Sequence, residues 1–263
     1  MERYTLLDKI YRFALRQGYA ENEDFEDNID LRVVGGSATQ LYTQEGALLR
    51  PTNDIDFAPS RKLSKQGCRI WGDRVQSKLM EFGHEASHKK TRSGHEVSLD
   101  GLDEPLFVHI DNYTPKFWKN NEFRIRAEDE RSNHIDLDGQ RVKVVRPEDV
   151  IAGKMKRLTY LARKGHLSDE EYGFFTLLEH GLFDDLVLPD LLAMATELNY
   201  DRRRNLEFFA KMDDKEREKI VSKYLARKDL YDAMLLVKAH QDNDWVMDGH
   251  LFVKATKEAF RTA

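Results

Sequence analysis

Two aspartates separated by one residue, Asp54 and Asp56, are the side chains of this sequence best suited to chemistry. Residues 54–57 (DIDF) alternate between polar and apolar, which is typical of a β-strand. Because successive side chains of a strand point to opposite faces, both carboxylates share one face and Ile55 and Phe57 point into a core. Paired carboxylates repel each other unless a cation lies between them, and hard oxygen ligands suit Mg²⁺, which also binds substrate phosphates. The spacing therefore predicts a divalent-metal site at Asp54 and Asp56.

A glycine-rich turn precedes the two aspartates. Gly35, Gly36 and Ser37 follow the apolar run of residues 31–34 and come before a helix-compatible segment, residues 38–42. Glycines allow successive backbone N–H groups to converge on an anion, the start of a helix adds a positive potential, and the Ser37 hydroxyl can donate a further hydrogen bond. Alone, such a turn is usually a plain connection, and an Asp-x-Asp pair is common on surfaces. In this order, the two together predict a nucleoside triphosphate site.

In these two segments, GGSA and RPTNDIDF, the chain resembles the nucleotidyltransferase superfamily. It is most similar to the AbiEii-type toxin nucleotidyltransferases, whose strand is typically written Arg-x-Ser/Thr-x-Asp-Ile-Asp. Residues 43–49 make the connection longer than the commonest spacing, and the resemblance does not explain them. The residues that it assigns to nucleotide binding are those of the turn and the arginine before the strand: Gly35, Gly36, Ser37 and Arg50.

The same resemblance implies a third carboxylate on a neighbouring strand. Residues 106–113 (LFVHIDNY) predict that strand, with His109 and Asp111 on one face and Val108 and Ile110 on the other. A carboxylate in a strand of the buried type costs free energy unless it is paired or bound to metal, which makes Asp111 the best candidate. The alternative is an ordinary aspartate at a strand end that faces water. Glu96, outside a clear strand, is a weaker candidate.

A helix is predicted to begin at Pro147, with two acidic residues in its first turn. Lys154 stands within or beside the apolar stripe of this helix. It either extends its ammonium group to solvent or points into a cleft toward an anion. The resemblance favours the second arrangement, because the family carries a lysine in a similar Pro-Glu-x-x-x-Ala-x-Lys segment that is implied to contact nucleotide phosphates.

The family's next motif, an arginine and then Lys/Arg-Asp-x-x-Asp, is not found in the residues that follow, RKGHLSDEEYGFF. Ser168 and Glu171 there have the spacing of a helix capping box. Asp169 is therefore interpreted first as a charge in the first turn of a helix, and only second as a carboxylate of the site.

The fold class predicted is α/β, a nucleotidyltransferase-like small mixed sheet with flanking helices, followed by a helical C-terminal region. Residues 1–146 would form the nucleotidyltransferase core domain and residues 147–263 the helical domain. His84, His88 and His95 could ligate a metal, but a solvated hairpin over residues 84–97 is favoured. Further elements are predicted as a helix over 64–82, short strands over 123–125 and 134–145, and helices over 213–226 and 229–240.

The composition bears on the partners and the cellular compartment expected for the protein. Its 263 residues include 42 basic and 47 acidic ones, and the net charge of −5 argues against nucleic acid bound over the whole surface while leaving room for local basic patches. The single cysteine, Cys68, excludes a disulfide framework and fits a reducing cytosol. Charges occur throughout the N-terminal segment, and no apolar run reaches the ~20 residues of a membrane helix. A cytoplasmic protein without a membrane partner is expected.

The expected activity is transfer of a nucleoside monophosphate from an NTP to an acceptor, with release of pyrophosphate. Two metal ions, Mg²⁺ or alternatively Mn²⁺, are expected at Asp54, Asp56 and Asp111, and Lys154 would offset charge on the leaving group. The resemblance implies a toxin that acts on tRNA or another translation component and has a cognate antitoxin protein. An antibiotic-modifying nucleotidyltransferase and a catalytically silent nucleotide-binding module are the alternatives. The catalytic residues expected are Asp54, Asp56, Asp111 and Lys154.

Overall fold

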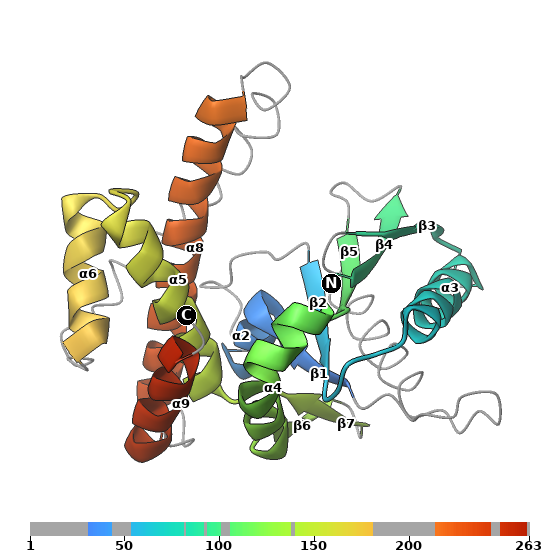
Figure 1. Cartoon of the computed structure of the whole chain (residues 1–263), viewed down its shortest axis with the longest axis horizontal. Helices are drawn as coiled ribbons and strands as arrows, with labels where there is room; N and C mark the ends of the chain where they lie inside the picture. The colour runs from blue at the N-terminus through green and yellow to red at the C-terminus, as the bar shows by residue number, and fades with distance from the viewer. Residues whose placement is uncertain are drawn as a thin grey trace. The chain divides into compact units, whose positions relative to one another are not determined.

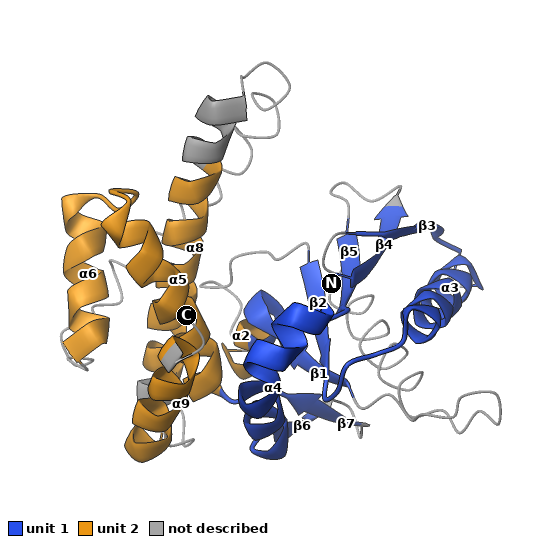
Figure 2. Ribbon diagram, in the orientation of Figure 1, with its two compact units in different colours: residues 1–38, 52–146 blue, residues 39–51, 147–263 orange. Residues whose placement is uncertain are grey.

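The computed structural model divides the chain into two compact units (Figure 2). The first comprises residues 1–38 and 52–146, and the second residues 39–51 and 147–263. The domain division expected from the sequence, at residues 1–146 and 147–263, remains a prediction. The structure describes residues 31–43, 54–81, 83–91, 94–100, 106–137, 140–180, 214–242 and 248–261.

A mixed sheet forms the centre of the first unit. Its seven strands among the described residues follow the order β3-β4-β5-β2-β1-β7-β6 (Figure 1). The pairs β2–β5 and β1–β7 are parallel, and the other neighbours are antiparallel. The α/β fold with a mixed sheet is thus confirmed. The strands are β1 Leu31–Val34, β2 Asp54–Pro59, β3 Glu85–Lys90, β4 Gly94–Asp100, β5 Leu106–Asp111, β6 Asn133–Leu137 and β7 Gln140–Val144.

Helices flank this sheet in the first unit and make up the described part of the second. The first unit contains α3 Lys65–Glu81 and α4 Pro115–Glu130, and α2 Gly35–Thr43 begins in it. Helices α3 and α5 confirm the ones predicted over residues 64–82 and from Pro147. The helices of the second unit are α5 Pro147–Arg163, α6 Asp169–His180, α8 Asp214–Asp242 and α9 Gly249–Arg261.

The side chains on one face of the sheet pack on α3 and form an apolar core with it. Ile55 and Phe57 of β2 and Val108 of β5 are buried, and the Phe57 ring meets the Trp71 ring of α3 edge to face at 6.0 Å. Because side chains alternate along a strand, burying these residues turns their sequence neighbours to the opposite face. The alternation predicted for β2 and β5 is therefore confirmed, and it leaves their acidic residues off the core face.

The strand predicted over residues 123–125 is wrong, because these residues lie in the middle of α4. Thr114 caps this helix by accepting a hydrogen bond from the Phe117 N–H, and Pro115 occupies its first turn. The buried residues Asn121 and Ile125 have helical spacing. The start signal thus outweighs the local strand propensity of residues 123–125.

The two helices predicted over residues 213–226 and 229–240 are one continuous helix, α8. Residues 227 and 228, Arg and Lys, are good helix formers, and neither glycine nor proline interrupts the segment. The hairpin predicted over residues 84–97 is confirmed as β3–β4, and the strand structure predicted over residues 134–145 is confirmed as the antiparallel pair β6–β7.

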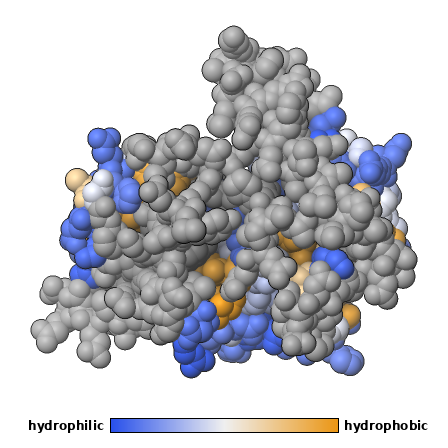
Figure 3. Space-filling view, turned by 180° about the vertical axis from the view of Figure 1, so that it is seen from behind, coloured by the Kyte–Doolittle hydropathy of each residue, from blue (hydrophilic) through white to orange (hydrophobic). Residues whose placement is uncertain are grey.

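Many of the described side chains on the surface are polar. In the view from behind, the described side chains at the borders are mainly hydrophilic, and apolar ones show in small areas between them (Figure 3). Within the described ranges, no helix combines the length and apolar character needed to cross a membrane.

Candidate functional site

The register of the central strands brings the predicted carboxylates onto one face of the sheet. Asp56 lies opposite His109 in the parallel β2–β5 pair, and Asp54 lies opposite Phe107. Asp111 follows two residues after His109 on the same side of β5. The side chains of Asp54, Asp56 and Asp111 therefore share what we call the carboxylate face, opposite to the face that packs on α3.

Asp56 and Asp111 interact electrostatically. Burial and the neighbouring Asp56 carboxylate raise the pKa of Asp111 from 3.8 to about 6, while His109 and Arg32 partly oppose this increase. Two neighbouring carboxylates do not readily carry a negative charge at the same time. A cation bound between them stabilises the form in which both are charged. No three or more His, Cys, Asp or Glu side chains of the described residues form a group that could hold a metal ion. Mg²⁺ takes one or two carboxylates and its other ligands from water and phosphate, so its binding at Asp56 and Asp111 stays a prediction.

The start of α2 lies directly against this pair. Gly35, the first residue of the helix, has φ 65°, a conformation that disfavours any side chain. A Cβ atom there would also come within 2.9 Å of Asp56 Oδ2. The glycine thus allows the positive end of α2 and the Asp56 carboxylate to approach each other closely.

Ser37 connects α2 to the strand that carries the aspartates. Its buried hydroxyl donates a hydrogen bond to the Asp54 carbonyl oxygen at 2.7 Å and accepts one from the Asp56 N–H at 3.3 Å. A hydroxyl has one proton, and here it is directed at the backbone of β2. Ser37 therefore positions Asp54 and Asp56, and a direct contact of its hydroxyl with phosphate stays a prediction. Arg50 lies outside the described residues.

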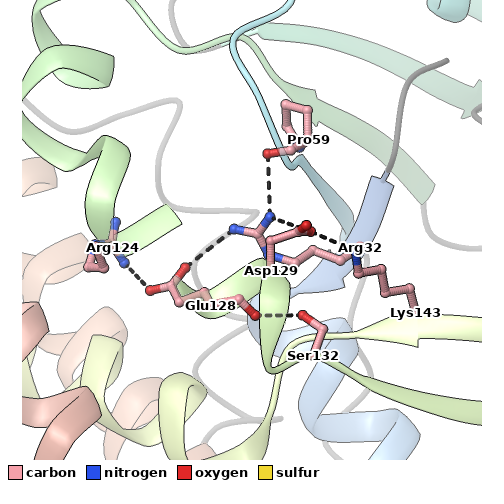
Figure 4. A network of polar contacts seen from close by, with 7 residues as sticks. All are labelled: Arg32, Pro59, Arg124, Glu128, Asp129, Ser132 and Lys143. Atoms are coloured by element: carbon pink, nitrogen blue, oxygen red, sulfur yellow. Dashed lines mark hydrogen bonds and ion pairs between the residues drawn. The ribbon is translucent and has the colours of Figure 1, made fainter. Parts of the chain in front are cut away.

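Arg32 is a buried cation beside the carboxylate face that sequence reasoning missed (Figure 4). It lies on β1 and pairs with Glu128 at 3.4 Å and with Asp129 at 3.3 Å, both on α4, and it donates a hydrogen bond to the Pro59 carbonyl oxygen at 3.4 Å. Lys143 of β7 also pairs with Asp129, at 2.9 Å. These contacts hold α4 on the sheet. The available signal was an arginine within the apolar run of residues 31–34, because a buried charge needs partners.

Glu96 was underestimated from the sequence, since it lies in β4 and opposite His109 in the register. Its Oε2 lies 2.8 Å from Nε2 of His109, and its Oε1 lies 2.6 Å from Nζ of Lys89. Glu96 thus orients a histidine that stands next to Asp56 on the carboxylate face. His88 and His95 differ from the expected solvated hairpin, because His95 is buried and its ring lies 2.8 Å from that of His88.

Lys154 belongs to a buried ion-pair cluster of the second unit. Its Nζ lies 2.6 Å from Oδ2 of Asp232 and 3.4 Å from Oδ1 of Asp229, both on α8. Arg157, one turn further along α5, pairs with Asp229 as well. The exposed fraction of Lys154 is 6%, so the ammonium group does not extend to solvent. Its contact with nucleotide phosphates stays a prediction.

The acidic partners of Lys154 lie in a segment with a spacing that residues 163–175 lack. Residues 228–232, Lys-Asp-Leu-Tyr-Asp, have the pattern Lys/Arg-Asp-x-x-Asp. Three residues apart on a helix, Asp229 and Asp232 share one side. A search for this pattern along the whole chain would have found it. Ser168 and Glu171 form the predicted capping box, and the Asp169 beside them is exposed.

Asp111→Asn is expected to stabilise the metal-free protein at neutral pH but not in acid. The folded protein keeps the Asp111 proton up to about pH 6, whereas the unfolded chain releases it near 3.8. The stability that this proton contributes is therefore present below about pH 4 and lost as the pH rises through about 6. A shift of this size corresponds to roughly 3 kcal/mol at most. Thermal melts without divalent ions should show the advantage of the variant growing between pH 4 and pH 7, and a difference independent of pH would contradict the coupling.

Comparisons with known proteins reveal distant structural similarity. No family model matches the chain, and no curated protein matches it either. It is similar to an antigenic nucleotidyltransferase-like protein from Paracoccidioides brasiliensis, with 15% identity, a TM-score of 0.40, and coverage of 76% of this chain and 91% of the other. It is also similar to a "putative nucleotidyltransferase" from H. pylori, with 14% identity, a TM-score of 0.31, and coverage of 91% and 98%. The AbiEii-type subgroup stays a prediction.

Proposed function

We propose that the protein is a Mg²⁺-dependent nucleotidyltransferase that moves a nucleoside monophosphate from an NTP to an acceptor and releases pyrophosphate. The observation that carries this proposal is the position of the Asp56 carboxylate, which lies against the first residue of α2 and repels Asp111 on the neighbouring strand. A helix start that attracts phosphate and a carboxylate pair that attracts a cation are thus combined within one unit.

The residues of the first unit would have separate roles in binding the NTP and in positioning the metal ligands. Backbone N–H groups at Gly35 and Gly36 would bind phosphate oxygens of the NTP, because the N-terminus of a helix attracts anions. Asp54 and Asp56 would hold Mg²⁺, with Ser37 fixing their strand. The bound Mg²⁺ would supply charge neutralisation on the triphosphate.

The acceptor would approach from the side of Asp111. This carboxylate faces Asp56 and is influenced by the histidine that Glu96 orients. A second ion, Mg²⁺ or Mn²⁺, is proposed at Asp111 for the acceptor hydroxyl. Lys154 remains a proposed contact of the departing pyrophosphate, and Arg50 a proposed contact of the nucleotide.

The biological role is proposed on the resemblance to AbiEii-type toxins. In that role the acceptor is tRNA or another component of translation, the protein acts in the cytoplasm, and a cognate antitoxin protein neutralises it. The pattern of Lys228, Asp229 and Asp232 adds a third segment to the two that first suggested the family.

The experiment that tests the function uses each of the four α-labelled NTPs with Mg²⁺ and total cellular RNA or protein as acceptor. We expect label in RNA, release of pyrophosphate, and loss of both when EDTA removes the metal. Label transferred to an aminoglycoside but not to RNA would favour an antibiotic-modifying enzyme. Binding of NTP without pyrophosphate release would favour a silent nucleotide-binding module, and no Mg²⁺-dependent NTP binding at all would overturn the proposal.

A further inference from the structure

Two histidines and an aspartate form a chain of polar contacts between α3 and the β3–β4 hairpin, which packs on that helix (Figure 1). Nδ1 of His88 on β3 lies 2.8 Å from Oδ1 of Asp73 on α3. Nε2 of the same ring lies 2.8 Å from Nδ1 of His95 on β4. The centroids of the two rings are 5.0 Å apart. We call these three residues the Asp–His–His cluster.

The Asp–His–His cluster is enclosed between the hairpin and the helix. The side chain of His88 is 8% exposed and His95 is 5% exposed, whereas the side chain of Asp73 is 55% exposed and connects the cluster to solvent. A Cβ atom at Gly72 would overlap the His88 ring. This ring therefore packs directly on the backbone of α3, and the cluster is part of the contact that holds the hairpin there.

The groups around the cluster disfavour additional positive charge. Lys90 on β3 lies opposite His95 in the hairpin register, and β5 faces His95 with an apolar side chain. Arg69 lies 3.9 Å from Asp73 along α3, so the aspartate also has a second cation nearby. Burial lowers the pKa of His95 below its ordinary value of 6.5, His88 and Lys90 lower it further, and Asp73 opposes them.

The hydrogen bonds of the cluster allow one added proton but not two. An ionised Asp73 only accepts, so Nδ1 of His88 carries a proton. With both rings neutral, Nδ1–H of His95 donates to Nε2 of His88. After uptake of one proton, Nε2–H of His88 donates to Nδ1 of His95, whose own proton is then on Nε2. A second added proton would place two N–H groups against each other at a nitrogen separation of 2.8 Å.

A proton suits this arrangement better than a metal ion does. Both nitrogens of His88 are engaged, one by Asp73 and one by His95, so the three side chains follow each other in a row. Metal ligands would instead surround a common point. Among the residues that the structure describes, no group of three His, Cys, Asp or Glu side chains is arranged to hold a metal ion.

We propose that the Asp–His–His cluster holds the β3–β4 hairpin on α3 with up to one added proton and releases it when acid supplies a second. Release would also affect the carboxylate face, because Glu96 follows His95 in β4 and contacts His109 there. Acid would thus separate Glu96 from the histidine that it orients. This pH response is a property of the fold and would exist whatever reaction the carboxylate face catalyses.

Release is measured by hydrogen exchange of the full chain at pH 7.5 and pH 5.0, with each rate corrected for the intrinsic exchange rate at that pH. The closed hairpin binds fewer protons than the open one below the ordinary histidine pKa of 6.5, so stability is lost as the pH falls below that value. For one histidine the effect at pH 5.0 is at most about thirtyfold.

The opening equilibrium of the β3 and β4 amides is therefore expected to increase about tenfold at pH 5.0, while that of the β6 and β7 amides changes less than about twofold. No change in β3 and β4 would overturn the proposal. An equal change in β6 and β7 would overturn it too, since the whole first unit would then open in acid.

His95→Asn separates proton uptake from the hydrogen bond. The amide of asparagine lies near the position of Nδ1 and can donate to His88 or accept from it, but it takes up no proton. The opening equilibrium of β3 and β4 should therefore no longer increase at pH 5.0, even if it is larger at both pH values. His134→Gln, which removes an exposed histidine from β6, is the matched control and should keep the wild-type response. A wild-type response in His95→Asn would overturn the proposal.

Histidine ¹⁵N spectra of the wild-type protein provide a test without substitution. The folded protein should keep a proton on Nδ1 of His88 at both pH values. Protons on all four ring nitrogens of His88 and His95 should appear only together with loss of protection in β3 and β4. A protected hairpin in which all four nitrogens carry protons would overturn the proposal.

Discussion

Asp56→Ala is expected to lower nucleotidyl transfer by at least about a hundredfold, or roughly 2.7 kcal/mol of transition-state stabilisation, while the first unit stays folded. Asp56 lies against the start of α2 and beside Asp111, where phosphate charge and a cation have to meet. Its loss removes a proposed metal ligand that matters most when charge builds on the departing pyrophosphate. Turnover is measured as pyrophosphate release with saturating NTP and Mg²⁺.

The fold of this variant is checked by thermal melts without metal at neutral pH. Removal of one of two repelling carboxylates should leave the melting temperature unchanged or raise it. Asp136→Ala, which removes an exposed aspartate from strand β6, is the matched control and should keep the wild-type rate. A folded Asp56→Ala protein with full Mg²⁺-dependent activity would exclude Asp56 from the metal site and contradict the proposed mechanism.

Which side chains of a strand share a face could be predicted from the sequence, because side chains alternate between the two faces of a strand. The alternation of Asp54, Ile55, Asp56 and Phe57 fixes which side chains share a face, and the structure has that arrangement. Pro147 and the acidic residues after it likewise predicted α5 correctly. Signals that lie within a few residues of each other therefore gave the right elements around the site.

Contacts between side chains of different strands and helices could not be predicted in the same way. The contact of Glu96 with His109 depends on the β4–β5 register, and the pairing of Arg32 with Glu128 joins residues 96 positions apart. Neither follows from periodicity, because a register shift of one residue would turn every side chain of a strand to the other face. Residues 123–125 illustrate the opposite error, since their local strand propensity was outweighed by the cap at Thr114, nine residues before Phe123.

The environment of Lys154 also depends on contacts with residues that are distant in the sequence. Its partner Asp232 is 78 positions away, and sequence periodicity alone suggested a side chain that either reaches solvent or faces a cleft. The structure instead surrounds the ammonium group with two buried aspartates. Its replacement is consequently expected to affect folding, which a lysine that extends to solvent would not do.

Lys154→Met is expected to destabilise the protein by about 3–5 kcal/mol, because it removes the ammonium group that lies 2.6 Å from the buried Asp232 carboxylate. Asp229 keeps its pair with Arg157, so most of the loss should arise at Asp232. Removing both members of a buried pair is often close to neutral. The double variant Lys154→Met with Asp232→Leu should therefore recover most of the stability, as measured by urea denaturation. Equal stability of wild type and Lys154→Met would contradict the ion-pair cluster.

The double variant also separates the two roles of Lys154. If its charge acts only on Asp229 and Asp232, the refolded double variant should transfer nucleotide at the wild-type rate. If the same ammonium group also offsets charge on the leaving pyrophosphate, as the resemblance implies, that stable variant should be at least about tenfold slower, or roughly 1.4 kcal/mol. Asp232→Asn with Lys154 intact provides the matched control, because it alters the cluster and keeps the cation. We expect the slower rate in the double variant and a smaller loss in Asp232→Asn, and equal rates in all three proteins would leave Lys154 a purely structural residue.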